Sequence, residues 1–434
     1  MSMAKAIFEV NIPFFEQQAL SWAQRFEELC FFQSNGYADE HHKISSVLAV
    51  KAVDAVSCAV STDAFTKIDA FRARYPQSWI PGFLSYDLKN DTESLHSRDD
   101  DGLTFPEAYF FKPAIILQFQ GEDSVVITAE DPQAVFDSIH AFQPSQQADA
   151  AYSSAPVQLR KRMTKEQYLA AFEKMQMHIR RGDIYEVNLC QEFYATDVVI
   201  DALTVYQQLN TISPTPFACF FKLGNRYIIS ASPERFLAKR GTMLISQPIK
   251  GTAARGQHAD EDNALLAELL NNPKEIAENI MIVDLVRNDL TRSAVPGTVD
   301  ASRRLEVHTF KQVHQLVSTI TCVKNPALSD IDVIKNTFPA GSMTGAPKIK
   351  AMQLCERYEA SKRGIYAGAV GYFGPDGDFD FNVVIRSILY NKQSGQLSFH
   401  TGGAITLDAQ AEKEYAECLL KASAILETLS ASLS

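Results

Sequence analysis

The chain has 434 residues and a formal net charge of −11, and 46% of its residues are hydrophobic against 21% charged. This composition is ordinary for packed globular domains and excludes a collagen-like, coiled-coil or intrinsically disordered chain. No apolar run reaches the ~18 residues that a membrane helix needs. No dense Lys/Arg stripe indicates a nucleic acid as partner. We therefore expect neither a membrane nor a nucleic acid among its partners.

Seven cysteines are spread along the chain, at positions 30, 58, 190, 219, 322, 355 and 418. No two of them form a C-x-x-C pair, which argues against a zinc site or a redox dithiol. The pattern is typical of reduced, buried thiols. The N-terminus also reaches Glu9 before an apolar signal-peptide core can form. We therefore expect a cytoplasmic protein.

The first part of the chain mixes helical and extended patterns. Residues 16–30 are predicted as helix, and the runs AIILQFQ and SVVITAE are predicted as strands. The segment 143–156 is polar, rich in small residues and bracketed by prolines, which is typical of a linker. We therefore divide the chain into a first region, 1–155, and a second region, 156–434, which holds nearly all the chemical motifs.

Clear helix and strand patterns follow in the second region. Thr164 begins a capping box, which predicts a helix to about residue 181. Asn272 and Pro273 predict the N-cap and first residue of a helix that runs to about residue 290. Strands separated by helices but rich in hairpin-like turns favour a mixed α/β chain over repeated βαβ units. The remaining predicted strands and the last helix are FACFFKL, RYIISAS, MLISQ, FNVVIRSILY, QLSFHTG and residues 408–429.

Two of the predicted helices each carry a pair of glutamates three residues apart, which places both carboxylates on one helix face. Glu275 and Glu278 form the first pair, and Glu414 and Glu417 form the second. Such oxygen ligands suit Mg²⁺, which keeps open positions for substrate oxygens. Solvated surface glutamates are the alternative for either pair alone. The apolar residues that follow Glu278 argue against a fully exposed helix.

Lys250 in QPIKGT and Glu234 in SPERF are two further candidates. Lys250 stands at the end of a strand-like run, where a lysine can bind phosphate, act as a nucleophile or lie on the surface. A nucleophilic lysine must be neutral, which burial or a neighbouring cation favours. Glu234 follows a Ser-Pro turn and can cap that turn, pair with Arg235 or act as a general acid.

Two loops of small residues and one arginine complete the candidates. FPAGSMTGAPK (338–348) lacks the spacing of a phosphate-binding P-loop, yet its backbone N–H groups and the Thr344 hydroxyl suit a carboxylate. TGGAIT (401–406) is a second loop of small residues. Arg386 lies in an otherwise apolar predicted strand, so it needs an anionic partner from the protein or from a ligand.

These motifs occur in a fixed order over about residues 160–425: SPERF, QPIKGT, ENIMIVDLVRND, FPAGSMTGAPK, YAGAVGY, FNVVIRS, TGGAIT and EYAEC. In this combination the chain resembles the chorismate-binding enzymes. That family includes the large subunits of anthranilate and aminodeoxychorismate synthases, and the isochorismate and salicylate synthases. The resemblance implies an α/β (α+β) fold of two packed, mostly antiparallel β-sheets with helices outside. It also implies that 1–155 is the variable N-terminal subdomain and 156–434 the chorismate-binding catalytic domain.

The resemblance implies chorismate as the substrate and Mg²⁺ as the cofactor. It assigns Glu278 and Glu417 as the main metal ligands, and it places Glu275 and Glu414 around them or in contact through water. The bound ion would hold the ring carboxylate of chorismate and withdraw electrons from the ring. Glu234 would then be the general acid that protonates the departing hydroxyl at ring carbon 4.

Five further positions are expected to bind the substrate by the same resemblance. Arg386 and Tyr366 match the residues that bind the side-chain carboxylate of chorismate. Thr344, Gly402 and Thr252 lie in the motifs that surround them. All five are therefore expected around one dicarboxylate ligand.

Position 250 separates two branches of the family. Anthranilate synthases resemble one another in having alanine here, as PIAGT, whereas component I of aminodeoxychorismate synthase often has lysine, as PIKGT. Lys250 therefore implies amination of chorismate at carbon 4, which gives 4-amino-4-deoxychorismate for para-aminobenzoate and folate synthesis. Lys250 would attack carbon 2 as the hydroxyl leaves, and ammonia would then add at carbon 4 and expel the lysine.

None of the seven cysteines has the G-x-C-x-G context of a class I glutaminase, which implies a separate glutaminase subunit, component II, as the ammonia source. Anthranilate synthase component I is the first alternative, and Lys250 argues against it. A catalytically silent scaffold that binds a glutaminase is the second alternative. Glu234, Lys250, Glu278 and Glu417 together argue against that. Isochorismate-type chemistry would need a water-activating base near GDIYEVNLCQEF, where no lysine occurs.

Overall fold

The structure is a computed structural model that describes residues 3–37, 40–93, 95–97, 101–143, 156–311 and 313–433. Its strands form two sheets that share one long antiparallel ribbon, made of β3 (Ser46–Cys58) and β5 (Ala108–Gln120). Most of the predicted linker, residues 144–155, lies outside the described residues.

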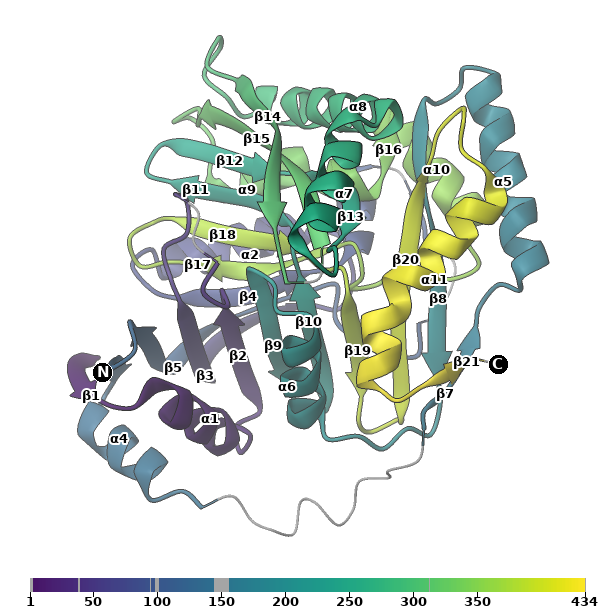
Figure 1. Ribbon diagram of the computed structural model, residues 1–434. Coiled ribbons are helices and arrows are strands. Elements are labelled where there is room, and N and C mark those ends of the chain that lie inside the picture. Colours follow the sequence, from purple (N-terminus) through teal and green to yellow (C-terminus); the bar gives the residue numbers. More distant parts are fainter. Residues whose placement is uncertain are drawn as a thin grey trace.

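The first sheet begins at one end of this ribbon and runs upright across the front of Figure 1. Its neighbouring strands are antiparallel, and β7 and β16 both pair with β8 at the far edge. A short parallel pair, β21 (Ser432–Leu433) with β7, closes that edge. In spatial order from the ribbon, one side carries β6 (Ser124–Ala129) and β1 (Ala4–Glu9), and the other carries β2 (Glu28–Gln33), β9 (Phe217–Leu223), β10 (Arg226–Ser232), β19 (Ser387–Asn391), β20 (Gln396–Ile405), β8 (Glu186–Ala195), β7 (Gln158–Lys161) and β16 (Gly345–Ala346).

The second sheet begins on the other end of β5 and lies across the first sheet, behind it in Figure 1. The ribbon bends between the sheets, because the register of β3 shifts between Ala52 and Asp54, and Lys51 has a φ of 64°. β13 and β14 both pair with β15 at the outer edge. The strands are, in order, β4 (Ile80–Leu84), β17 (Ala369–Phe373), β18 (Phe379–Val383), β11 (Arg235–Arg240), β12 (Met243–Gln247), β15 (Val313–Val323), β13 (Ile249–Ala254) and β14 (Asp300–Thr309).

Apolar side chains from both sheets fill the space between them. Phe221 of β9 packs edge-on against Phe83 of β4, with ring centroids 5.3 Å apart, and against Tyr109 of β5, at 6.5 Å. The predicted architecture of two packed, mostly antiparallel sheets is confirmed. The structure adds that the sheets are hydrogen-bonded to each other through the shared ribbon.

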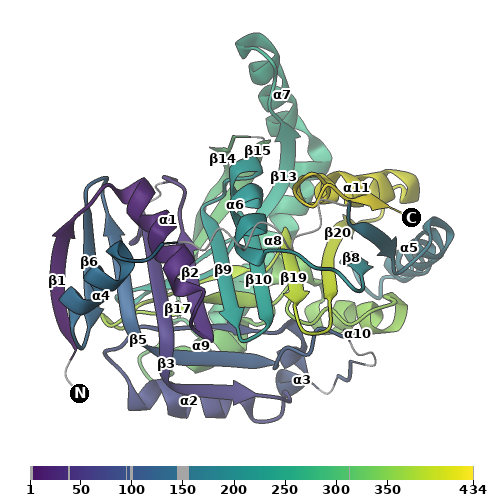
Figure 2. The same cartoon turned by 90° about the horizontal axis from the view of Figure 1, so that it is seen from below.

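Helices cover the outer faces of both sheets, as predicted. Figure 2 shows that α7 projects away from the rest of the chain. Within the described ranges, none of the helices combines the length and apolar character that crossing a bilayer requires. The first sheet is covered by α1 (Ile12–Ala23), α4 (Pro132–His140), α6 (Ala202–Ile212) and α11 (Ala411–Thr428), its far edge by α5 (Lys165–Arg180) and α10 (Lys348–Tyr358), and the second sheet by α2 (Ala64–Arg74), α8 (Pro273–Thr291) and α9 (Asp330–Thr337), while α7 spans Ala259–Asn271 and α3 spans Lys89–Thr92.

Most element predictions agree with the structure, and two do not. Thr164 forms the predicted capping box of α5, and Asn272 caps α8. The predicted helix over 16–30 is wrong in its second half, because α1 ends at Ala23 and the continuously buried run ELCFFQ forms β2. The predicted strand FNVVIRSILY is also wrong, since it divides into β18 and β19 with Arg386 at the bend between them.

We expect Phe221→Ala to lower the free energy of unfolding by about 3–5 kcal/mol, because it removes a fully buried ring from the layer between the sheets. Urea denaturation followed by circular dichroism measures the change. Phe14→Ala is the control, since the Phe14 side chain is 65% exposed. Equal destabilisation by both substitutions would contradict the inter-sheet packing described here.

Candidate active site

Lys250 is held on β13, where its ammonium group meets a carboxylate of the first sheet. Its Nζ donates a hydrogen bond to Oε1 of Glu186, on β8, at 2.6 Å. The two side chains are 11% and 6% exposed. Burial alone would lower the pKa of Lys250, but the carboxylates of Glu186, Glu278 and Glu234 together raise it above its usual value. Lys250 is therefore a cation here and must lose a proton before it can act as a nucleophile.

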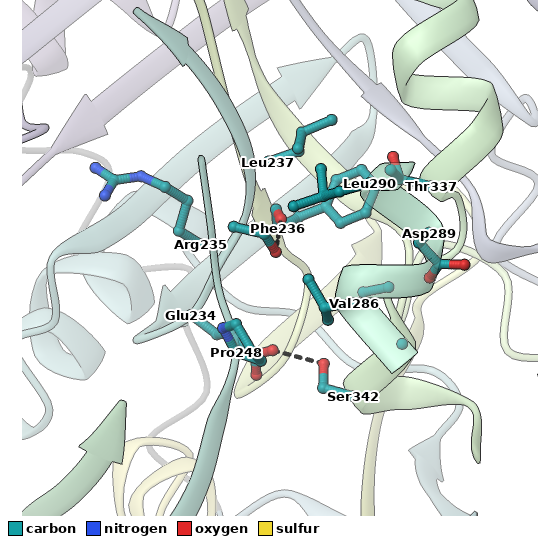
Figure 3. A pocket seen from close by; sticks show the side chains of 13 residues that line it. Glu234, Arg235, Phe236, Leu237, Pro248, Val286, Asp289, Leu290, Thr337 and Ser342 are labelled. Atoms are coloured by element: carbon teal, nitrogen blue, oxygen red, sulfur yellow. Dashed lines mark hydrogen bonds between the residues drawn. The ribbon is translucent and has the colours of Figure 1, made fainter. Parts of the chain in front are cut away.

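Glu234 lies buried in the turn between β10 and β11. Ser232 shapes this turn, because its hydroxyl donates to Val383 O at 2.6 Å and accepts from the Glu234 N–H at 3.3 Å. Figure 3 shows the Glu234 carboxylate facing Ser342, whose hydroxyl donates to Glu234 Oε1 at 2.5 Å. Burial raises the pKa of Glu234 to about 7, although Ser342 and Lys250 oppose this rise. A group with this pKa can give up a proton near neutral pH.

The loop 338–348 brings Ser342 to Glu234 and then runs along β8. Its residues Gly345 and Ala346 form β16, which pairs with Val187 and Glu186. Gly345 has a φ of +148°, and a Cβ there would lie 2.2 Å from the carbonyl oxygen of Glu186. Only glycine therefore lets the loop approach β8 so closely.

Thr344, predicted to contact substrate, lies in the same loop and is fully buried. Its hydroxyl donates to the carbonyl oxygen of Gly341 at 2.9 Å, and its own carbonyl oxygen accepts from the Asn188 N–H at the same distance. These contacts hold the loop against β8. The contacts of Thr344 in this structure therefore stabilise the conformation of the loop.

Arg386 lies in the bend between β18 and β19 and has a φ of 50°. Its carbonyl oxygen accepts a hydrogen bond from the Ala231 N–H at 3.2 Å. Burial lowers the pKa of its guanidinium, and the charge of Glu234 opposes this. Within the described part of the chain, the guanidinium makes no hydrogen bond or ion pair. Arg386 is therefore a cation near Glu234 that can receive an anionic ligand.

Tyr366 is buried and has contacts of its own. Its ring stacks on His400, with centroids 4.9 Å apart, and its hydroxyl oxygen accepts from Cys190 Sγ at 3.7 Å. Burial raises the pKa of the Tyr366 hydroxyl. Among the residues that the structure describes, no hydrogen bond joins Tyr366 to Arg386 or Lys250.

Gly402 and Thr252 have different surroundings. A Cβ on Gly402 of β20 would lie 2.8 Å from Sγ of Cys190 and from the carbonyl oxygen of Leu189, so glycine is required there by packing against β8. The next residue, Gly403, faces Glu414 instead. Thr252 is exposed on β13, two positions after Lys250.

The two predicted glutamate pairs face each other from α8 and α11. Burial raises the pKa of Glu278 to about 7. Burial, with the charge of Glu417 adding to it, also raises the pKa values of Glu275 and Glu414. Burial has the same tendency at Glu417, but Lys421, 2.7 Å away, lowers the pKa of that carboxyl overall. The four carboxylates therefore form one negative cluster, in which Glu278 and Glu414 are buried and Glu275 and Glu417 are partly exposed.

Lys274 supplies a cation to this cluster. Its Nζ lies 3.1 Å from Oε1 of Glu414 and 3.7 Å from Oε1 of Glu278. In this arrangement no three acidic, histidine or cysteine side chains of the described ranges are placed to hold a metal ion. The donors nevertheless fit a hard cation, because all are carboxylates and the buried Oε1 of Glu278 finds no hydrogen-bond partner among the described residues.

Three residues of this site were not predicted from the sequence: Glu186, Ser342 and Lys274. Glu186 is an acidic residue in a mainly apolar run, IYEVNLC. A buried acid needs a partner, so this position could have been recognised as a candidate from the sequence. Ser342 and Lys274 lie inside recognised motifs, but their contacts join residues more than a hundred positions apart. Only the fold reveals such contacts.

The sequence profile of the chorismate binding enzymes matches residues 20–427. This chain belongs to that family. The match includes most of the first region as well as the second. The family match therefore spans both sheets of the fold.

Relatives with two different names match at similar identity. An anthranilate synthase component I-like protein from Synechocystis is 36% identical over 357 residues, which cover 81% of this chain and 72% of the relative. Aminodeoxychorismate synthase component 1 of Escherichia coli is 35% identical over 350 residues, 80% of this chain and 76% of the relative. The crystal structure of anthranilate synthase component I from Streptococcus pneumoniae matches with a TM-score of 0.76 at 26% identity, covering 91% of this chain and 95% of that one.

We expect Glu234→Gln to stabilise the protein at pH 8 by up to about 3 kcal/mol. The folded-state pKa of about 7 lies above the ordinary 4.5, so stability is lost as pH rises from about 4.5 to 7 and Glu234 ionises. Glutamine avoids this cost. Urea denaturation at pH 5 and pH 8 measures the difference, which should be small at pH 5. The exposed substitution Glu122→Gln is the control, and equal stability of Glu234→Gln and wild type at pH 8 would contradict the burial effect.

We expect Lys274→Met to bind Mg²⁺ at least about tenfold more tightly than the wild type. The substitution removes a positive charge that lies between two carboxylates of the cluster. Isothermal titration calorimetry without substrate measures the affinity. Lys413→Met, an exposed change on α11, should leave it unaltered. Unchanged or weaker binding by Lys274→Met would show that Lys274 does not compete with the metal.

Proposed function

We propose that this chain converts chorismate and ammonia to 4-amino-4-deoxychorismate, with Lys250 as the nucleophile. The observation that carries this proposal is the position of the Lys250 amine, buried among carboxylates and in the same charged cluster as Glu234. The aminodeoxychorismate synthase names of several relatives support it. A lysine on the surface would have no such surroundings.

The proposed reaction has two displacement steps. In the first, the neutral Lys250 amine forms a bond to ring carbon 2, the ring double bonds shift, and the bond from carbon 4 to its hydroxyl breaks. Glu234 gives its proton to the departing hydroxyl, which leaves as water. In the second, ammonia forms a bond to carbon 4, the double bonds shift back, and the amine of Lys250 leaves carbon 2.

Lysine at position 250 explains why nitrogen ends at carbon 4. While the lysine occupies carbon 2, ammonia cannot react there, and carbon 4 is the position from which the lysine can be expelled. With alanine at this position, carbon 2 would be open to ammonia, which leads toward the anthranilate skeleton. The choice between two products therefore depends on one side chain.

Chorismate carries two carboxylates, and the site offers cations for both. Arg386, whose guanidinium lacks a protein partner within the described ranges, is proposed to bind the side-chain carboxylate, with Tyr366 and the loops at Thr344 and Gly402 around it. An arginine can bind a carboxylate through two parallel hydrogen bonds. Such binding would fix the ring relative to Lys250.

The acidic cluster is proposed to hold Mg²⁺, with Glu278 and Glu417 as ligands and Glu275 and Glu414 around them. When bound, the ion would neutralise the ring carboxylate and withdraw electrons from the ring. Lys274 would move away from Glu278 and Glu414 to make room. Support comes from the raised pKa values of three of these acids, because burial disfavours their charged forms and a bound cation would stabilise them.

Ammonia is proposed to come from a separate glutaminase subunit, because the chain has no G-x-C-x-G motif of its own. The "component 1" names of relatives support a two-subunit arrangement. A cytoplasmic location and a role in folate synthesis belong to the same proposal.

Product analysis tests the proposal. Purified protein is incubated with chorismate, Mg²⁺ and ammonium at mildly alkaline pH, beside Lys250→Ala and the exposed control Lys67→Ala. We expect 4-amino-4-deoxychorismate from the wild type and from Lys67→Ala. We expect Lys250→Ala to lose that product by at least about a hundredfold, because its nucleophile is gone, or to divert toward carbon 2. Anthranilate from the wild type would instead make this chain an anthranilate synthase.

A further inference from the structure

The proposed reaction requires Lys250 to lose a proton before its nitrogen can bond to carbon 2. Nζ of Lys250 donates a hydrogen bond to Oε1 of Glu186 at 2.6 Å, and both side chains are largely shielded from solvent. Water is therefore a poor acceptor for this proton. The acceptor must be sought among the neighbouring side chains.

The three carboxylates that act most strongly on Lys250 are those of Glu186, Glu278 and Glu234. Glu275 and Glu417 of the acidic cluster act on it more weakly. Glu234 is needed in its protonated form, as the acid for the departing hydroxyl. Glu278 is proposed as a metal ligand, and a carboxylate bound to a divalent cation is a weak proton acceptor. Glu186 is the one of the three that hydrogen-bonds Lys250 directly, and neither other task requires it.

The backbone holds Glu186 in a fixed position at the start of β8. Glu186 pairs with Ala346 of β16, and the preceding residue, Tyr185, donates its N–H to the Ala346 carbonyl oxygen at 2.7 Å. Gly345, the other residue of β16, pairs with Val187 and approaches the Glu186 carbonyl too closely for any side chain larger than hydrogen. The carboxylate therefore meets Lys250 from a rigid strand rather than from a loop.

We propose that Glu186 is the catalytic base that takes the proton from Lys250 before attack and returns it when the lysine is expelled. This inference rests on the proposed function. The carboxylate of Glu186 accepts one proton from the ammonium of Lys250, which frees a lone pair on Nζ. That pair forms the bond to carbon 2, and Nζ, now bearing two hydrogens and the ring, is positively charged.

The second displacement restores the starting state. Ammonia bonds to carbon 4, and the bond between carbon 2 and Nζ breaks with its electrons returning to Nζ as a neutral amine. The carboxylic acid of Glu186 then gives its proton back to that amine. The carboxylate left on Glu234 after the first step can accept the surplus proton of the new carbon–nitrogen group, so that the sum is chorismate and ammonia giving product and water.

The substitution Glu186→Gln tests this role, because glutamine can still accept the hydrogen bond of Lys250 but cannot take its proton. We expect kcat at pH 7 to fall by about a hundredfold or more, with little change in KM for chorismate. Below pH 7, where Glu234 keeps its proton, we also expect the remaining rate to rise about tenfold per pH unit, because Lys250 must now lose its proton to solvent. The carboxyls of Glu234, Glu275, Glu278 and Glu417 also act on Lys250, but they are present in both proteins, so the wild type should lack this slope.

Glu186→Asp and Glu192→Gln complete the design. Glu186→Asp keeps the base and should retain more activity than Glu186→Gln, without the steep pH slope, which also protects the test if the glutamine variant does not fold. Glu192 is a second buried glutamate of β8, six residues further along, and pairs with Arg162. Its replacement by glutamine removes a buried acid from the same strand and should keep the wild-type pH dependence.

The outcomes separate the two proposals. Full activity of Glu186→Gln with the wild-type pH dependence, beside an inactive Lys250→Ala, would overturn the base and leave the proposed function standing. A wild type that makes no aminated product at carbon 4, or a Lys250→Ala that keeps making it, would overturn both. Loss of kcat together with the new pH slope in Glu186→Gln would establish Glu186 as the base.

Discussion

A buried lysine ammonium surrounded by carboxylates is the interaction on which the site depends. A charge removed from water is tolerated only when opposite charges and hydrogen bonds compensate it. Lys250 receives that compensation from Glu186 directly and from Glu234 and Glu278 through their charges. The same compensation holds the amine in place, while burial raises the pKa of Glu234 to about 7 against the opposing charge of Lys250. Charge and burial together thus set the position and protonation of the groups that are proposed to react.

The fold assembles this balance from distant segments. Glu186 begins β8 of the first sheet, whereas Lys250 lies on β13 at the outer edge of the second. Packing of the two sheets through the layer around Phe221, and their covalent and hydrogen-bonded union in the β3–β5 ribbon, are what bring those edges together. Since both members of the ribbon belong to the first 155 residues, that region contributes directly to the scaffold of the site.

Local sequence patterns predicted the elements well where the cause of structure is itself local. The caps at Thr164 and Asn272 hold because a side chain bonds to backbone a few residues away. Arg386 was placed in a continuous strand, and its φ of 50° has a cause that no local pattern contains: surrounding structure that holds a non-glycine residue in a strained conformation. Glu186 was missed for the same reason, since its role depends on a partner 64 residues away.

Family membership alone leaves the product open, because relatives bearing both enzyme names match this chain about equally. Two buried acids of the candidate site also lower the stability of the folded protein. Glu278 and Glu234, with pKa values raised to about 7, destabilise the folded protein near neutral pH when they ionise. This cost of ionisation would be relieved at Glu278 by a bound divalent cation and at Glu234 by uptake of a proton. The candidate site therefore has ionisation costs that its proposed ligands would relieve.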